Sequence, residues 1–242
     1  MKGDFSMSGK LYLVTTPIGN LEDITLRALR VLKEVDVIAA EDTRHSRQLL
    51  SHFDIHSELV SYHAFNEHDK TDALLKRIEN GENIALVTDA GTPSVADPGF
   101  FLVRAAQERD LDIAVIPGVS AVTFAVTASG LPVDKFAFFG FVPVKSGRKS
   151  TFFADIKEKN ITSFVFESPF RVGKTLDFIR EFFGDEVQIA IIREATKIHE
   201  EVIKGTAGEV CEKCRNRAWK GEFVIGIAPQ HAESCANDED MD

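Results

Sequence analysis

Short apolar, β-branched runs alternate with segments of helical period through the first half of the chain, and this alternation restricts the fold more than any other feature. The runs predict strands over residues 11–15, 35–40, 59–62, 84–88 and 113–116. Between them, Asp23 is predicted to cap one helix, a second helix runs from Asn66 to Gly81, and a third begins at Asp97-Pro98. Strands that alternate with helices indicate an α/β fold with a parallel sheet covered on both faces.

The second half continues the α/β pattern with a difference in its strands. Strands are predicted over residues 136–139, 163–166, 187–192, 201–204 and 222–227, and helices near 149–159, 170–183 and 206–217. These strands alternate partly with polar residues, which favours mixed or antiparallel pairing. Residues 113–133 carry no charge and have the length of a membrane span, but their prolines and glycines predict a strand, a turn and a short helix instead.

We therefore predict two α/β domains, residues 10–118 and 119–228, between a flexible N-terminus (1–9) and an acidic, disordered tail (229–242). The net charge of the 242 residues is −10, but the last fourteen residues hold five acids and no Lys or Arg, which leaves −5 for the rest. A net acidic chain lacks the field of a nonspecific nucleic-acid binder, so any contact with nucleic acid has to come from local basic clusters.

Cysteine usage and the start of the chain favour a cytoplasmic protein. The three cysteines have no regular spacing and form no disulfide framework, and the first residues contain no apolar run of signal-peptide length. The spacing Cys211-x2-Cys214 followed by His231-x3-Cys235 imitates a zinc-ligand set. A predicted strand separates the two pairs and the second pair lies in the expected tail, so we expect no metal site.

In an open α/β sheet, ligands bind outside the carboxyl ends of the strands, so the turns after the strands are the place to look for a site. The turn after the first strand contains Pro17 and Gly19. The turn after the fourth strand is rich in small residues and contains Asp89, Gly91, Thr92, Pro93 and Val95. Such residues let a ligand approach a rigid backbone, although Gly and Pro also simply make turns. Neither turn fits a dinucleotide fingerprint, and the chain contains no P-loop.

Two further turns are dense in acid, amide and imidazole groups. Glu41, Asp42 and Arg44 follow the second strand, and His63, Asn66 and Glu67 follow the third. Such groups supply acid–base chemistry and hydrogen bonds to a substrate. Helix capping explains Asp42 and Asn66 equally well, but it requires neither Arg44 nor His63. After the fifth strand, Ser120 can cap a helix or offer its hydroxyl and amide to a ligand.

The second half supplies the local basic clusters. Lys145, Arg148 and Lys149 lie in a predicted loop, Arg171 follows a strand that ends near Glu167, and Arg193, Glu194 and Lys197 follow another strand. Arg and Lys beside Ser and Thr suit phosphate contacts, although a run of charges is also typical of a solvated face.

Seven segments, in this order, resemble one family. They are TTPIGNLEDIT, AAEDTRHS, VTDAGTPSVADPG, IPGVSAV, ASGLPVDKFAFFGFVP, REATKIHEE and KGEFVI. Together they are similar to the ribosomal RNA small subunit methyltransferase I family, which has the tetrapyrrole-methylase fold of the class III methyltransferases. The resemblance runs from about Lys10 to Ala228. The acidic tail and the pair Cys211 and Cys214 depart from the family pattern.

The resemblance implies two α/β domains with S-adenosylmethionine bound in the cleft between them, and a homodimer. It implies transfer of the methyl group to the ribose 2′-hydroxyl of one cytidine in the decoding region of small-subunit ribosomal RNA, free or in the assembled subunit. The cofactor contacts implied by matching motifs, with Gly19 from the first turn, are Pro17, Gly19, Asp89, Gly91, Thr92, Pro93, Val95, Ser120, Ala121 and Phe166.

The expected chemistry needs no metal, because the sulfonium already carries an activated methyl group and alignment of the reactants contributes about 7–11 kcal/mol. A base that removes the hydroxyl proton adds roughly 10²–10⁴-fold. The candidates for this base are Glu41, Asp42, His63, Glu67, Glu194 and Lys197. The residues expected to hold RNA phosphates are Arg44, Arg171, Arg193, Lys145, Arg148 and Lys149, while Asn66 orients the ribose or base. The 2′-hydroxyl excludes DNA as acceptor, and we expect no membrane partner.

Two alternatives remain open. The same fold can methylate a tetrapyrrole or another small molecule, in which case binding is nearly insensitive to salt. A noncatalytic module that binds a nucleotide or RNA during ribosome assembly would gain no stability from the cofactor and would tolerate Asp89→Ala.

Overall fold

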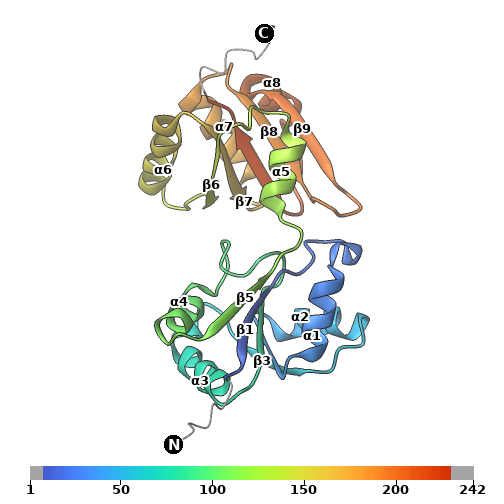
Figure 1. Cartoon of the computed structure of the whole chain (residues 1–242). Helices are drawn as coiled ribbons and strands as arrows, with labels where there is room; N and C mark the ends of the chain where they lie inside the picture. The colour runs from blue at the N-terminus through green and yellow to red at the C-terminus, as the bar shows by residue number, and fades with distance from the viewer. Residues whose placement is uncertain (1–7, 230–242) are drawn as a thin grey trace, which may run out of the picture. The chain divides into compact units, whose positions relative to one another are not determined.

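The computed structural model describes residues 8–229, and the chain divides into two compact units, Met1–Ser120 and Ala121–Asp242 (Figure 1). The first unit contains a sheet in the order β3-β2-β4-β1-β5, in which every pairing is parallel. The predicted parallel sheet is confirmed. Its elements are β1 (Lys10–Val14), the 3-10 helix η1 (Leu21–Asp23), α1 (Leu26–Glu34), β2 (Val37–Ala40), α2 (Thr43–His52), β3 (Glu58–Ser61), α3 (Glu67–Glu79), β4 (Ile84–Val87), α4 (Phe100–Glu108) and β5 (Asp112–Ile116).

Helices cover both faces of this sheet, because the strands are apolar on both sides. One core joins the sheet to buried side chains of α3 and α4, such as Leu75 and Leu102. The other core joins it to α1 and α2 through Leu32 and Leu50. The carboxyl ends of all five strands therefore point to one edge, where the connecting loops are free to build a site.

Three predicted details of the first unit were wrong. Asp23 does not cap α1, because Thr25 does so by accepting from Ala28 N at 3.0 Å, and Asp23 lies in the preceding 3-10 turn. The fourth helix begins at Phe100 rather than at Asp97-Pro98. Gly9 does not belong to a flexible N-terminus, because it is buried and donates its amide to Ile78 O at 2.7 Å.

The second unit contains a mixed sheet in the order β6-β7-β10-β8-β9, with only β6 and β7 parallel among the paired strands described. The predicted mixed pairing is confirmed. A register shift between Phe138 and Phe141 of β6 marks a bulge. The elements are α5 (Ala121–Ser129), β6 (Phe136–Phe141), α6 (Ser146–Lys159), β7 (Thr162–Glu167), α7 (Val172–Phe183), β8 (Gln188–Arg193), β9 (Glu201–Thr206), α8 (Ala207–Lys213) and β10 (Phe223–Ile227).

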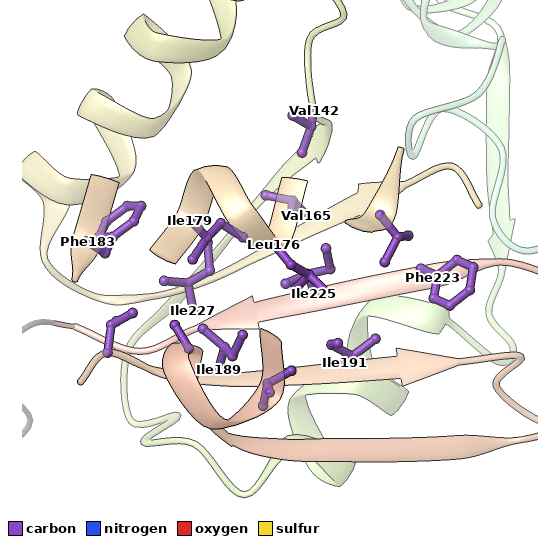
Figure 2. Packing of buried hydrophobic residues seen from close by; sticks show 14 of the residues in the cluster. Val142, Val165, Leu176, Ile179, Phe183, Ile189, Ile191, Phe223, Ile225 and Ile227 are labelled. Carbon is purple, nitrogen blue, oxygen red and sulfur yellow. The ribbon is translucent and has the colours of Figure 1, made fainter. Parts of the chain in front are cut away.

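The core of the second unit lies between its sheet and the helices α6, α7 and α8. Figure 2 shows Leu176 and Ile179 of α7 packed toward Ile225 and Ile227 of β10. Two helix boundaries differ from prediction. The segment 145–149 is not a loop, because α6 begins at Ser146, and α8 ends at Lys213 rather than near 217, after a capping box at its start.

The charge-free stretch 113–133 forms β5, a turn and α5, as predicted. Within residues 8–229, no helix is both long and apolar enough to cross a membrane. The predicted tail, including His231 and Cys235, lies outside the described residues apart from Pro229.

Candidate functional site

The loops after β1 and β4 are joined directly at the carboxyl edge of the first sheet. Thr16 and Gly91 exchange two backbone hydrogen bonds, Thr16 N to Gly91 O at 2.9 Å and Gly91 N to Thr16 O at 3.2 Å. The hydroxyl groups of Thr15 and Thr92 lie 3.1 Å apart. Pro17 and Pro93 are buried beside this bridge, while Gly19 and Val95 are exposed. Two of the predicted cofactor loops are therefore brought together.

The loop after β4 stores backbone strain. Ser94 and Ala96 adopt φ values of 71° and 65°, in the left-handed region that residues with a Cβ rarely enter. Gly99 has φ 140°, and a Cβ at this position would lie 2.5 Å from Ser94 Oγ. Strained backbone of this kind clusters at ligand sites. The loop turns back on itself, with Ser94 N donating to Pro98 O at 3.2 Å.

The loop after β5 reaches the same edge. A Cβ on Gly118 would lie 2.9 Å from Thr15 Cγ2, so the backbone at Gly118 packs directly against the Thr15 side chain. Ser120 follows at the end of the first unit and Ala121 begins α5 in the second. Within the first unit, the loops after β1, β4 and β5 therefore converge.

Three carboxyl groups gather beside these loops: Glu41 after β2, and Asp89 and Asp97 in the loop after β4. Asp89 Oδ1 accepts from Asp42 N at 3.1 Å, which ties the β2 and β4 loops together. Burial, followed by the charge of Asp89, raises the pKa of Glu41. Burial together with Glu41 and Asp89 raises the pKa of Asp97 to about 6. Asp97 was not among the predicted site residues, because Asp-Pro is typical of a helix start; the repeated acids near the strand ends were the available signal.

Asp42 and Arg44 form a local pair that does not behave as a base. Asp42 caps α2 by accepting from Arg44 N at 2.8 Å, and its carboxylate also binds the Arg44 guanidinium. These hydrogen bonds lower the pKa of Asp42 to about 2. Arg44 keeps 87% of its side chain exposed, so it remains open to a further anion.

The loop after β3 holds His63 in a defined orientation. Asn66 Oδ1 accepts from His63 N at 2.8 Å, and Asn66 Nδ2 lies 3.2 Å from His63 Nε2. An amide nitrogen only donates, so Nε2 is the acceptor in this contact. Nδ1 is buried without a partner in the described part of the chain. His63 acts on the pKa of Glu41 in the lowering direction, against the larger effect of burial. Asn66 thus orients His63 instead of capping α3, and Glu67 lies in the first turn of that helix.

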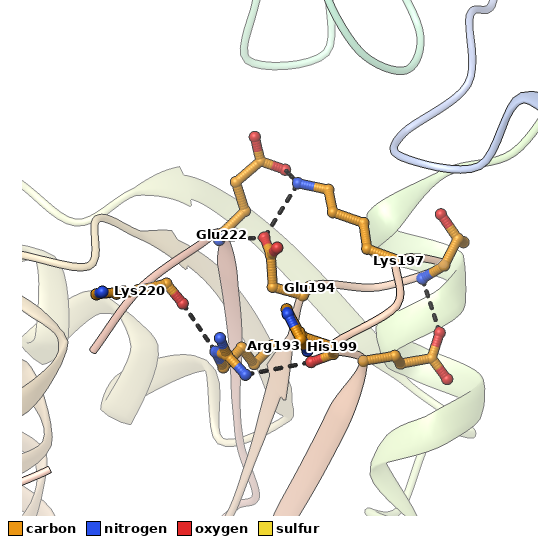
Figure 3. A network of polar contacts seen from close by, with 8 residues as sticks. Arg193, Glu194, Lys197, His199, Lys220 and Glu222 are labelled. Atoms are coloured by element: carbon orange, nitrogen blue, oxygen red, sulfur yellow. Dashed lines mark hydrogen bonds and ion pairs between the residues drawn. The ribbon is translucent and has the colours of Figure 1, made fainter. Parts of the chain in front are cut away.

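In the second unit, the predicted group after β8 forms a closed ion-pair network. Figure 3 shows Lys197 bound to both Glu194 and Glu222, at 3.0 and 2.9 Å. Although burial opposes it, hydrogen bonds from the Glu222 amide and from Lys197 lower the pKa of Glu194. The pKa of Lys197 is raised by Glu222 and Glu194 against the effect of burial. Arg193 donates to the carbonyl oxygens of Lys220 and His199 (Figure 3).

A second internal network lies under the loop after β7. The buried carboxylate of Glu167 accepts from Ser168 N and Thr175 Oγ1, both at 2.7 Å, and pairs with Arg171 at 2.6 Å. Lys149 donates to Thr175 Oγ1 at 3.2 Å, and burial lowers the pKa of Lys149. Lys149 therefore joins the first turns of α6 and α7, while Arg171 ties the start of α7 to Glu167 of β7 and to Val142 O.

The remaining predicted cations are free. Lys145 and Arg148 lie at the start of α6, both exposed, and across residues 8–229 neither side chain forms an ion pair or hydrogen bond. Cations in the first turn of a helix oppose its dipole, so helix stability does not explain them. Phe166, the last predicted cofactor contact, packs against Phe138 and Phe141 at ring distances of 4.7 and 5.3 Å.

The two described cysteines lie at the end of α8. Cys211 lies in α8 and Cys214 ends it, and among the described residues no group of three or more His, Cys, Asp or Glu is arranged to hold a metal ion. Burial raises the pKa of both thiols.

Comparison with known proteins gives the family. The model of the Tetrapyrrole (Corrin/Porphyrin) Methylases matches residues 10–211. The Ribosomal RNA small subunit methyltransferase I of Streptococcus pyogenes serotype M1 is 42% identical over 231 residues, 96% of this chain and 80% of the relative. The Haemophilus influenzae protein of that name is 42% identical over 236 residues, 96% and 83% of the two chains.

A solved structure shares the fold. Uroporphyrin-III C-methyl transferase from Thermus thermophilus, complexed with S-adenyl homocysteine, has a TM-score of 0.61 and 21% identity, with 90% of this chain and 97% of that chain covered. Because its relatives of 42% identity match 96% of it, and because the tetrapyrrole-methylase fold spans both units, the chain belongs to the ribosomal RNA small subunit methyltransferase I family.

Proposed function

We propose that this protein transfers the methyl group of S-adenosylmethionine to the ribose 2′-hydroxyl of one cytidine in the decoding region of small-subunit ribosomal RNA. It is a methyltransferase that uses S-adenosylmethionine, and its relatives carry a small-subunit ribosomal RNA activity in their names. The observation that carries the proposal is the convergence of the loops after β1, β4 and β5, bridged by Thr16 and Gly91, in a chain of that family.

The residues at this edge fit the cofactor. Gly91, at φ 88°, has no side chain of its own to keep a ligand from the backbone, and a Cβ there would meet only Ile18 Cγ2, at 3.5 Å. The hydroxyl groups of Thr15 and Thr92 lie 3.1 Å apart in the same pair of loops. Bound there, the cofactor supplies a methyl group already activated on a sulfonium. The residues proposed to hold it are Pro17, Gly19, Asp89, Gly91, Thr92, Pro93, Val95 and Ser120 from the first unit, and Ala121 and Phe166 from the second.

Among the candidate bases, the pKa directions favour Glu41, with His63 beside it. A pKa of about 2 leaves Asp42 too weak a base, and the raised pKa of Lys197 keeps it protonated. The pKa of Glu194 is lowered, and its carboxylate is already bound by Lys197 and by the amide of Glu222. Burial and the charge of Asp89 raise the pKa of Glu41 although His63 opposes the rise, so Glu41 is better suited to accept the hydroxyl proton. Asn66 orients His63, and Glu67 lies in the first turn of α3.

The cations divide into two groups. Arg44, Lys145 and Arg148 are exposed and are proposed to contact RNA phosphates. Lys149, Arg171 and Arg193 are engaged inside the second unit and are proposed to position its loops beneath the RNA. A small-molecule substrate would give the exposed cations no role. We further propose that the protein acts in the cytoplasm as a homodimer, on RNA free or in the assembled subunit.

The direct test uses small ribosomal subunits and labelled S-adenosylmethionine. Wild type is expected to label one ribose in the ribosomal RNA. Glu41→Gln should lower the rate by roughly 10²–10⁴-fold without weakening cofactor binding. Glu34→Gln, which removes an exposed carboxylate paired with Arg30, is the matched control. Absence of label in ribosomal RNA, or label on a base, would overturn the proposal.

Cofactor binding is tested separately by thermal unfolding. At 100 times its dissociation constant, S-adenosylmethionine should stabilise wild type by about 2.7 kcal/mol. Asp89→Ala should lose most of this gain, because Asp89 anchors the bridge between the β2 and β4 loops. A noncatalytic assembly factor would show no stabilisation with either protein.

A further inference from the structure

We infer that the loop after β7 and the first turn of α6 form a binding surface for single-stranded RNA, on which Phe170 stacks against an unpaired base. Lys145, Arg148 and Lys174 contact the phosphates on either side of that base. The inference rests on the proposed function for its ligand, RNA, and adds the single-stranded state and the stacking residue.

Phe170 is exposed in a way that folding does not explain. It keeps 92% of its surface open to solvent, and within residues 8–229 its ring contacts no other aromatic ring. Val144, in the neighbouring loop, is 80% exposed. Folding normally removes large apolar side chains from water, and exposed apolar groups rimmed by polar residues mark interaction sites.

The backbone that presents Phe170 is held from below. Phe170 N donates to Ser168 Oγ at 3.3 Å, and Ser168 N donates to the buried carboxylate of Glu167. Arg171 pairs with the same carboxylate and donates to Val142 O at 2.9 Å. These bonds fix the loop after β7 beside the loop that leads to Lys145. The ring is therefore presented by a preorganised loop, which reduces the entropy lost on binding.

The charges around Phe170 complement a nucleic-acid backbone. Lys145, Arg148 and Lys174 are exposed, and none of their side chains has an ion-pair partner in the described part of the chain. The nearest buried acid, Glu167, is already neutralised by Arg171. Lys149 ties the two helix starts together through Thr175. The surface thus combines free positive charge with one exposed aromatic ring on a loop whose backbone is held by hydrogen bonds.

Single-stranded RNA fits this combination better than a duplex. An aromatic side chain stacks on a base only if the base is unstacked from its neighbours, while the cations follow the backbone. A duplex hides its base faces and offers phosphates alone. Phe170 would therefore add affinity for single strands and none for duplexes.

The test measures binding of the full-length protein to a cytidine-rich single-stranded oligoribonucleotide and to the same strand annealed to its complement. Phe170→Ala should weaken single-strand binding roughly tenfold to hundredfold and leave duplex binding unchanged. Phe170→Tyr keeps a stacking ring and should restore most of the affinity. Leu26→Ala, which truncates another exposed apolar side chain (87% exposed), is the control and should bind like wild type.

Salt dependence separates stacking from phosphate contact. Phe170→Ala should leave the slope of log affinity against log salt unchanged, whereas Lys145→Gln and Arg148→Gln should each reduce it by about 0.7. Equal losses for single strands and duplexes, or wild-type affinity in Phe170→Ala, would overturn the inference. If wild type methylates small subunits and Phe170→Ala binds single-stranded RNA as well as wild type does, the inference is refuted and the proposed function stands. If Phe170→Ala loses single-strand binding but wild type does not methylate small subunits, the proposed acceptor is refuted and the inference stands.

Discussion

Asp97 carries a charge that the folded protein tolerates poorly, so neutralising it should stabilise the first unit. Its carboxyl group lies with Glu41 and Asp89, and burial together with these two charges raises the pKa of Asp97 from 3.8 to about 6. The folded state therefore binds a proton more tightly than the unfolded state does. Asp97→Asn keeps the shape and removes the ionisation.

The sign and size follow from proton linkage. Below about pH 4 Asp97 is protonated in both states and contributes nothing. As the pH rises from about 4 to about 6 the unfolded state ionises first, so stability falls, and above that the full penalty is present. A shift of about two pKa units corresponds to at most about 3 kcal/mol, and partial solvent access reduces this to about 1–2 kcal/mol. The variant should gain that amount at pH 7 and above.

Urea unfolding at a series of pH values measures this gain. The only tryptophan, Trp219, reports the second unit, while both tyrosines, Tyr12 and Tyr62, report the first. Asp110→Asn is the control in the first unit, since its side chain is exposed and Asn accepts the same positive φ of 53°. A variant no more stable than wild type at pH 8, or a gain independent of pH, would refute the reasoning.

Three further changes test other parts of the structure. Thr175→Val removes a buried hydroxyl that donates to Glu167 and accepts from Lys149; it should cost about 1.5–3 kcal/mol in urea unfolding followed by Trp219, and Thr175→Ser should cost less. Gly118→Ala forces a Cβ to within 2.9 Å of buried Thr15 and should lower the thermal midpoint by the equivalent of about 1–3 kcal/mol, whereas Gly147→Ala, with open space around it, should not. Asp42→Ala removes the cap of α2 and should cost about 1 kcal/mol, and Asp42→Asn, which still caps, should recover most of it.

The sequence carried enough information to predict both sheets and the loops that form the candidate site. Continuous apolar runs such as 84–87 mark strands buried on both faces, and the turns after them contain the residues that could be named in advance. Helix starts were less predictable. Gly99 is the N-cap of α4, and the loop before it passes through the left-handed region at Ser94 and Ala96. Serine and alanine give no signal of that conformation in the sequence.

Side-chain partners across elements were beyond prediction from the sequence. Arg193 and Lys149 occur in basic clusters typical of phosphate contact. In the structure, however, Arg193 donates to two carbonyl oxygens and Lys149 donates to a threonine hydroxyl. Asp97 joins Glu41 and Asp89 because the strand order places β2 next to β4, an arrangement that no local pattern specifies. Exposure of Phe170 likewise depends on which neighbours the fold brings to it.

The bulge in β6 also opposes the formation of cross-β fibrils. The strand reads Phe-Ala-Phe-Phe-Gly-Phe, an uncharged, aromatic-rich segment at the edge of its sheet, which is the composition that seeds cross-β fibrils. A regular edge of this kind would be a template for pairing with another chain. The register shift between Phe138 and Phe141, with Gly140 at φ 72°, interrupts the row of free amides and carbonyls. Without the bulge, β6 would present a regular edge that could pair with another chain and start aggregation.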